Sequence, residues 1–158
     1  MLEILPMTEE HIEAVLQVEQ SCFTLPWTKE DFEREMKENK LAIYRIAILD
    51  HKVVGYAGMW HVVTEGHITN IAVLEQYRRQ GIAKALMEEI IHIAEQQEMI
   101  GITLEVRISN LAAQKLYTSY GFRPEGFRKK YYLDTKEDAV IMWKYFPNYE
   151  NYEQEVTK

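Results

Sequence analysis

Cysteine is almost absent from this chain, which has one cysteine, Cys22, among its 158 residues. A single cysteine excludes an internal disulfide framework and any zinc site built from several thiolates. Long apolar runs are lacking too, and none approaches the roughly 18 residues of a membrane-spanning helix. No basic start followed by an apolar stretch is present, so we expect no signal peptide, no membrane partner and a cytoplasmic location.

Basic charge is also in short supply, with 18 Lys and Arg against 25 Asp and Glu, a net charge of −7. Duplex nucleic acid requires a basic face, so direct binding to nucleic acid is not expected. Residues 1–40 alone hold 10 acidic and 4 basic residues. This acidic segment is either a pair of solvated helix faces or a surface that attracts a basic partner, and the sequence leaves both open.

The remaining composition is that of a globular domain. Hydrophobic residues make up 47% and charged residues 27% of the chain, which excludes disordered and collagen-like classes. A chain of this length corresponds to one domain. It can bury about 70% of its unfolded surface without disulfides or metals.

The first half of the chain predicts four strands, with two helices between the first strand and the other three. The predicted strands cover residues 2–5, 41–49, 52–63 and 67–74. One predicted helix begins after Thr8, and a second runs from Thr28 to about Lys37. Thr28 and Asp31 resemble a capping box. Gly55 and Gly58 indicate a bulge or a close backbone approach. Glu65 and Gly66 predict a turn. The last three of these strands are expected to form an antiparallel meander.

The second half changes pattern. It predicts a helix over residues 81–97, a strand over 101–108, a helix from Asn110 to about Tyr120 that stops at Gly121, and a strand over 139–145. Alternation in the strand puts Glu105 and Arg107 on its polar face. Residues 147–158 are polar and acidic and are expected to fray. The order of elements indicates a mixed α/β fold.

Residues 71–84 (IAVLEQYRRQGIAK) are the first stretch with recognisable chemistry. A strand leads into an arginine-rich turn, and Gly81 then opens a helix. Unpaired N–H groups at a helix start bind anions, and glycine lets a ligand approach the backbone. Because neither G-K-[ST] nor G-x-G-x-x-G is present, this is not a P-loop or a dinucleotide fingerprint. The spacing fits a phosphate site and a plain helix start with solvated arginines equally well.

Residues 104–120 (LEVRISNLAAQKLYTSY) are the second stretch. Glu105 lies mid-strand, where a carboxylate is solvated, paired with Arg107 or another base, or lines a cleft. Tyr117 lies two helical turns beyond Asn110, on the same face. Strand glutamates are usually solvated and helix tyrosines usually pack in the core, so neither residue alone indicates catalysis.

The motifs together resemble the GNAT N-acetyltransferases. R-x-x-G-x-A at Arg78, Gly81 and Ala83 is similar to that family's acetyl-CoA loop, and PWTKEDF, HITNIAV, LEVRISNLAAQKLY and RKKYYLDTKEDAVIMW resemble its bacterial N-terminal protein acetyltransferases. The resemblance covers residues 2–146. It implies one acetyltransferase domain over residues 1–146, with a mixed α/β fold: a twisted, mostly antiparallel sheet of six or seven strands and about four helices. It also implies transfer from acetyl-CoA to the N-terminal alanine of a small, basic ribosomal protein.

The resemblance also implies a cofactor site. Backbone groups of Ile71, Ala72 and Val73 would meet the pantetheine arm and thioester. The pyrophosphate would lie against Arg78, Arg79, Gln80, Gly81, Ile82, Ala83 and Lys84, and Asn110 would contact the cofactor. Ala83 stands where the family often has a second glycine, an accepted variant.

The same resemblance proposes Glu105 as general base and Tyr117 as general acid. The base is needed because an α-amino group, with a pKa near 7.7–8.0, is mostly protonated at pH 7. An N–H near Val73 would stabilise the oxyanion, and Tyr117 would protonate the leaving thiolate. Cys22 lies in a predicted loop without a partner base and is interpreted as an ordinary thiol.

Substrate contacts are expected from Trp27, Tyr131, Tyr132 and Asp134, where an acid could hold an α-ammonium or a basic side chain; the tyrosines could instead only buttress their loop. The five histidines lack metal-ligand spacing, so no metal is expected. Two alternatives remain at this point: an acetyltransferase of the same fold that acts on a small amine, a polyamine or protein lysines, and a non-catalytic acyl-CoA-binding module.

Overall fold

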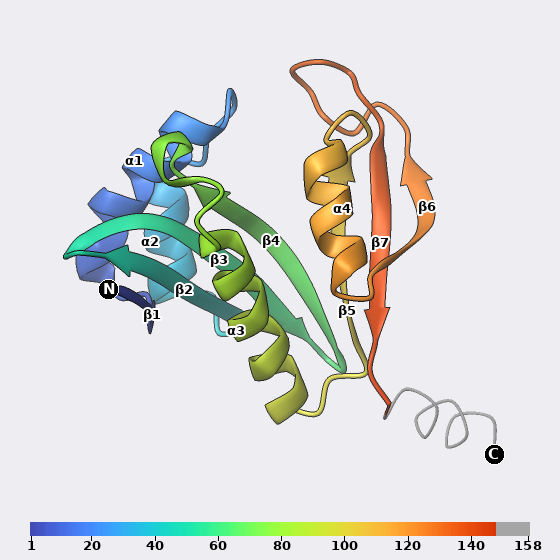
Figure 1. Ribbon diagram of the computed structural model, residues 1–158, viewed down its shortest axis with the longest axis horizontal. Coiled ribbons are helices and arrows are strands. Elements are labelled where there is room, and N and C mark those ends of the chain that lie inside the picture. The colour runs from blue at the N-terminus through green and yellow to red at the C-terminus, as the bar shows by residue number, and fades with distance from the viewer. Residues whose placement is uncertain (148–158) are drawn as a thin grey trace. The chain divides into compact units, whose positions relative to one another are not determined.

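Seven strands and four α-helices make up the computed structural model over the residues that it describes, 1–147 (Figure 1). The strands are β1 (Leu2–Pro6), β2 (Ala42–Leu49), β3 (Lys52–Val62), β4 (Glu65–Val73), β5 (Gly101–Arg107), β6 (Arg123–Arg128) and β7 (Ala139–Tyr145). The helices are α1 (Ile12–Cys22), α2 (Lys29–Lys37), α3 (Ile82–Gln96) and α4 (Leu111–Ser119), with short 3-10 turns at Glu9–His11 and Glu75–Tyr77. The predicted mixed α/β class is confirmed.

The strands form one sheet in the order β1-β2-β3-β4-β5-β7-β6. The pairs β1–β2, β2–β3, β5–β7 and β6–β7 are antiparallel. The pair β4–β5 is parallel and joins Glu65–His67 to Gly101–Thr103. The sheet is therefore mostly antiparallel, as expected.

The chain divides into two compact units. The N-terminal unit comprises Met1–His61 and Thr69–Ile91, and the C-terminal unit comprises Val62–Ile68 and the described residues from His92 onward. The predicted frayed tail, residues 147–158, lies outside the described residues apart from Pro147.

The N-terminal unit packs α1 and α2 onto its strands through a shared apolar core. Its buried members include Val15, Val18, Phe32, Ile46 and Tyr56. These side chains recur at helical spacing in α1 and alternate along the strands, which is why these segments bury one face each. The predicted capping box at α2 is confirmed, because Asp31 N–H donates to Thr28 Oγ1 over 3.2 Å and Thr28 N–H to Asp31 Oδ2 over 2.8 Å.

Both features expected of the β3 glycines are present. The β2–β3 register shifts between Ala47 and Ile48, opposite Gly55, which marks a bulge. A Cβ on Gly55 would lie 2.8 Å from the Ala72 carbonyl oxygen, and one on Gly58 would lie 2.3 Å from the Tyr44 ring. Glycine at position 55 is therefore required for β4 to approach β3 closely, and glycine at position 58 makes room for the Tyr44 ring.

In the C-terminal unit, α4 is tied to the ends of two strands. Gln114 Nε2 donates to the carbonyl oxygens of Arg107 and Ile108, 3.0 Å each, and Lys144 Nζ donates to the Tyr120 carbonyl over 2.7 Å. Gly121 stops α4 with φ +92°, as predicted. The core side of β5 carries Ile102, Leu104 and Val106, all buried.

Two predicted boundaries are wrong, and one strand is missing from the prediction. The turn after β3 falls at Val63 and Thr64 rather than at Glu65 and Gly66, because the latter pair with β5. Strand β6 was not predicted, because its sequence RPEGFR contains proline and glycine, which are uncommon inside strands. Helix α1 extends to Cys22, so this cysteine ends a helix rather than lying in a loop.

Candidate functional site

The segment between β4 and α3 has the backbone geometry of an anion site. Arg79 and Gly81 adopt left-handed conformations, with φ +63° and +81°. The Gly81 carbonyl accepts from Ala85 N–H over 3.0 Å, so the N–H groups of the first helical turn have no partner within the helix. A Cβ on Gly81 would meet no atom within 4 Å. Left-handed residues before a helix start form a concavity that suits a phosphate group.

Side chains of this segment differ in exposure. Arg79, Gln80, Gly81 and Lys84 are exposed, Ala83 is half-buried and Ile82 is buried. The exposed members are thus those whose backbone or charge a phosphate would meet, whereas Ile82 anchors the helix start in the core.

Arg78 is engaged in holding the end of β4. Its Nε donates to the Val73 carbonyl over 3.1 Å, and its Nη2 lies 3.7 Å from Cys22 Sγ. The Cys22 thiol itself donates to the same carbonyl over 3.4 Å. The guanidinium therefore joins the end of β4 to the end of α1, a role that the sequence did not predict.

The strand residues expected to meet the thioester are the last three of β4. Ala72 and Val73 are buried and Ile71 is half-buried. Just before them, Asn70 Oδ1 is buried and finds no hydrogen-bond partner among residues 1–147. Ile71, Ala72 and Val73 thus lie at the end of a strand, as predicted.

Trp27 is held by a buried carboxylate that sequence reasoning missed. Glu19 is 1% exposed; its Oε2 accepts from the Trp27 backbone N–H over 2.9 Å and its Oε1 from the Tyr56 hydroxyl over 2.5 Å. Burial raises the pKa of Glu19, and the two hydrogen bonds oppose that rise. The Trp27 ring packs 5.4 Å from the Phe32 ring. The spacing of Glu19, four residues after Val15 on the buried face of α1, was the available signal.

In the C-terminal unit, Glu105 pairs with Arg128 rather than with Arg107. Arg128 Nε donates to Glu105 Oε1 over 3.1 Å, and the glutamate side chain is 27% exposed. The carboxylate is thus held in place through Oε1.

Tyr117 lies on α4 as predicted. Its ring lies 5.8 Å from that of Phe122, and burial raises the pKa of its phenol to about 12. The phenol therefore keeps its proton at neutral pH, which a general acid must do.

Tyr131 and Tyr132 lie in the loop between β6 and β7, with rings 5.1 Å apart in an edge-on arrangement. Burial raises the pKa of Tyr132 to about 12, and the neighbouring Tyr131 adds to that rise. The charge of Arg107 opposes the rise, and Glu105 and Tyr117 add smaller contributions to it. Burial and then the charge of Glu105 raise the pKa of Tyr131. The charge of Glu105 thus reaches both tandem tyrosines.

Asp134 has a protein partner for each carboxylate oxygen. Arg107 Nη1 donates to Oδ1 over 2.9 Å and Nη2 to Oδ2 over 2.8 Å. The substrate contact expected of Asp134 therefore competes with a bidentate ion pair.

Asn110 caps α4, with its Oδ1 accepting from Ala113 N–H over 3.1 Å. The predicted cap is confirmed, and the predicted cofactor contact stays a prediction. Within residues 1–147, no group of three or more His, Cys, Asp or Glu could hold a metal ion. None of the helices described is long and apolar enough to cross a membrane.

Comparison with known proteins decides the family. The model of the acetyltransferase (GNAT) family matches residues 12–122. The chain belongs to the GNAT acetyltransferases. It is an enzyme of that family, whose members use acetyl-CoA, and its seven-stranded sheet with four α-helices is the GNAT fold.

Bacterial ribosomal-protein N-acetyltransferases are among the similar proteins. A Bacillus subtilis (strain 168) protein, provisionally named ribosomal protein bS18-alanine N-acetyltransferase, is 42% identical over 137 residues, covering 87% of this chain and 91% of that protein. The enzyme of that name from Escherichia coli (strain K12) is 36% identical over 131 residues, covering 82% and 87%. The crystal structure of the ribosomal-protein-S18-alanine N-acetyltransferase from Escherichia coli superposes with a TM-score of 0.85 at 33% identity, covering 92% and 94%.

Proposed function

We propose that this GNAT enzyme transfers an acetyl group from acetyl-CoA to the α-amino group of the N-terminal alanine of a basic small-subunit ribosomal protein. The observation that carries this proposal is the 42% identity with the Bacillus subtilis relative across 91% of that protein's length. Similarity that extends over nearly the whole of a relative includes the segments that select the acceptor as well as those that bind the cofactor.

Residues 1–146 form a single acetyltransferase domain in this proposal. The family match, residues 12–122, runs through stretches of both compact units, which supports one functional domain. Acetyl-CoA supplies the acetyl group as an activated thioester. The backbone of residues 79–84 binds its pyrophosphate, a role supported by the left-handed Arg79 and Gly81 and by the open space beside Gly81.

The remaining cofactor contacts follow the same assignment. Backbone groups of Ile71, Ala72 and Val73 orient the thioester, and Asn110 contacts the cofactor. Arg78 serves this site by fixing the Val73 carbonyl through its Nε. Fixing a strand end in this way preorganises backbone donors, which stabilise negative charge without reorganising during the reaction.

Glu105 acts as the general base. An α-ammonium must lose its proton before it can attack, and the Glu105 carboxylate takes it directly or through water. The Arg128 contact on Oε1 holds the carboxylate in position. Tyr117 then protonates the leaving thiolate, because its phenol carries its proton at neutral pH.

The acceptor peptide is recognised by Trp27, Tyr131 and Tyr132, with Asp134 in the same loop as the tyrosines. Aromatic rings give a peptide a rigid contact surface. The charge of Glu105 reaches Tyr131 and Tyr132, which supports a proposed base that works beside the peptide-binding residues of the C-terminal unit.

Acetyl transfer to two peptides tests this function. Both peptides carry the basic N-terminal sequence of the ribosomal target with internal lysines; one begins with a free alanine and the other has that amine blocked. Mass spectrometry locates the acetyl group. We expect one acetyl group on the free α-amine and none on the blocked peptide. Acetylation of lysines in both peptides would instead identify a lysine acetyltransferase, and no transfer to either peptide would exclude this acceptor.

A further inference from the structure

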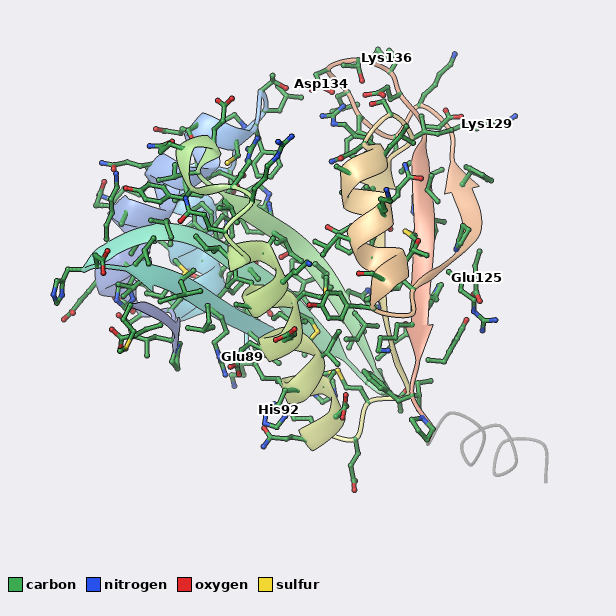
Figure 2. All side chains as sticks on the ribbon, viewed as in Figure 1. Glu89, His92, Glu125, Lys129, Asp134 and Lys136 are labelled. Carbon is green, nitrogen blue, oxygen red and sulfur yellow. The ribbon has the colours of Figure 1, made fainter. Side chains whose placement is uncertain are left out.

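The loop that joins β6 to β7, residues 129–138, lies largely on the surface (Figure 2). Lys130 and Lys136 adopt left-handed conformations, with φ +51° and +61°. Two backbone hydrogen bonds are internal to the loop, from Tyr132 N–H to Glu137 O (3.2 Å) and from Lys136 N–H to Tyr132 O (2.9 Å). A loop with little apolar burial and strained residues needs another source of order.

Side chains of the loop supply part of that order, since Asp138 Oδ1 accepts from Lys130 N–H over 2.9 Å and Asp134 Oδ1 from Thr135 N–H over 2.8 Å. Arg107, from β5, adds contacts from outside the loop. Besides its bidentate pair with Asp134, its Nη1 donates to Thr135 Oγ1 over 3.0 Å and to Glu137 Oε2 over 3.3 Å. The side chains of Arg107 and Asp134 are 29% and 17% exposed, so the pair is partly shielded from solvent. One guanidinium thus binds three residues of the loop.

The same guanidinium contacts Tyr132, the second of the tandem tyrosines. Arg107 Cζ lies 4.1 Å from the centre of the Tyr132 ring, and that ring meets Tyr131 edge-on at 5.1 Å. A planar guanidinium can stack on a ring while its edge binds a carboxylate, and a lysine ammonium cannot do both. Arg107 therefore contacts the Tyr132 ring directly and the Tyr131 ring through it.

We propose that Arg107 is a positioning residue that presets Tyr131 and Tyr132 for the acceptor peptide, with Asp134 as its anchor. Asp134 acts through this pair and does not itself bind the substrate ammonium. This inference rests on the proposed function, because it assigns the loop to peptide capture. Its consequence is that the loss of Arg107 weakens peptide binding and leaves the chemical step and acetyl-CoA binding intact.

The variants Arg107→Gln, Arg107→Lys, Asp134→Asn and the double variant Arg107→Gln/Asp134→Asn test the proposal. Arg34→Gln is the matched control, because Arg34 forms an exposed ion pair with Asp31 in the N-terminal unit. Steady-state kinetics give kcat and the KM of each substrate. Cleavage by trypsin after Lys129, Lys130 and Lys136 reports the order of the loop without reference to activity; Figure 2 shows two of these lysines with Asp134.

We expect each Arg107 variant to raise the peptide KM by about tenfold, with kcat and the acetyl-CoA KM changed by less than about twofold. We expect faster tryptic cleavage of the loop in the Arg107 variants. The control Arg34→Gln should keep wild-type kinetics and wild-type cleavage. Asp134→Asn should raise the peptide KM as much as Arg107→Gln does. The double variant should raise it no further, because the two residues act as one unit.

Unchanged peptide KM and unchanged loop cleavage in the Arg107 variants would overturn the proposal. Additive losses in the double variant would also overturn it, since Asp134 would then act on the substrate independently. If Arg107→Gln fails to fold, Arg107→Lys and Asp134→Asn carry the same test. A wild-type enzyme that acetylates neither peptide would overturn the proposed function, and trypsin would still show whether Arg107 orders the loop.

Discussion

At the scale of single residues, the side-chain pairs show what a sequence pattern can and cannot predict. Alternation along β5 correctly places Glu105 and Arg107 on one face. It does not predict their partners, because these are set by register across three strands: Arg107 and Arg128 both align with Ala139 on β7. From this position Arg128 binds Glu105, whereas Arg107 binds Asp134 in the loop between β6 and β7.

Tyr117→Phe should lower kcat by about 100-fold if the phenol is the general acid. Near wild-type turnover in a folded variant would contradict that role. Phe keeps the ring contact with Phe122, so the fold should persist. Turnover of acetyl-CoA with the free-alanine peptide is the measurement.

The raised pKa of Tyr117 also predicts a pH dependence. The phenol has a pKa of about 12 when folded, against a usual value of about 10. Its contribution to stability is therefore complete below about pH 10 and is lost as the pH rises through about 12. Ultraviolet difference titration of wild type against Tyr117→Phe should show one phenol that ionises near pH 12; a midpoint near 10 would contradict it.

At the scale of elements, the strong patterns are predictable and the irregular ones are not. Helix α3 and strands β5 and β7 follow from periodicity. Strand β6 has proline and glycine in its interior and mostly exposed residues, and a sheet tolerates such a strand at its edge, where β6 lies. The turn at Val63 escapes prediction because its φ of +55° is unusual for a β-branched residue.

Glu19 links α1, the segment before α2, and β3. Glu19→Leu leaves the Trp27 N–H and the Tyr56 hydroxyl without an acceptor, so we expect the free energy of unfolding to fall by about 2–5 kcal/mol. Glu19→Gln keeps an acceptor and should lose about 1 kcal/mol. Denaturant unfolding measures both. Equal losses in the two variants would show that the hydrogen bonds are not the source of the effect.

Gly81 begins the turn into α3 with a left-handed backbone. Gly81→Ala should lower the free energy of unfolding by about 1 kcal/mol through backbone strain. It should also raise the acetyl-CoA KM, since a Cβ enters the open space beside the loop. Gly126→Ala is the control, because a Cβ there meets its nearest atom at 3.6 Å. An unchanged acetyl-CoA KM in Gly81→Ala would count against the phosphate assignment.

At the scale of the whole molecule, charge is distributed in a way that suits a basic acceptor. Residues 1–40 carry most of the net charge of −7. Raising ionic strength should therefore increase the KM of a basic peptide several-fold and leave kcat unchanged, because salt screens long-range attraction. A neutral peptide with the same free alanine is the control. Equal salt dependence for both peptides would contradict electrostatic capture.

The family is accessible from sequence because its motifs are contiguous: the R-x-x-G-x-A turn and the SN-to-tyrosine helix each lie within one stretch. The contacts that position the site join distant stretches. Glu19 meets Tyr56, Arg78 meets Cys22 and Arg107 meets Asp134. Such pairs depend on tertiary packing, which periodicity and propensity do not specify.

The most direct measurement for the account as a whole is kcat of Glu105→Gln with acetyl-CoA and the free-alanine peptide. The control is Glu125→Gln, whose carboxylate accepts from the Tyr145 hydroxyl in the same unit. We expect a loss of about 100-fold or more for Glu105→Gln and near wild-type turnover for the control. Wild-type turnover by a folded Glu105→Gln enzyme would contradict the proposal that this carboxylate takes the proton from the acceptor amine.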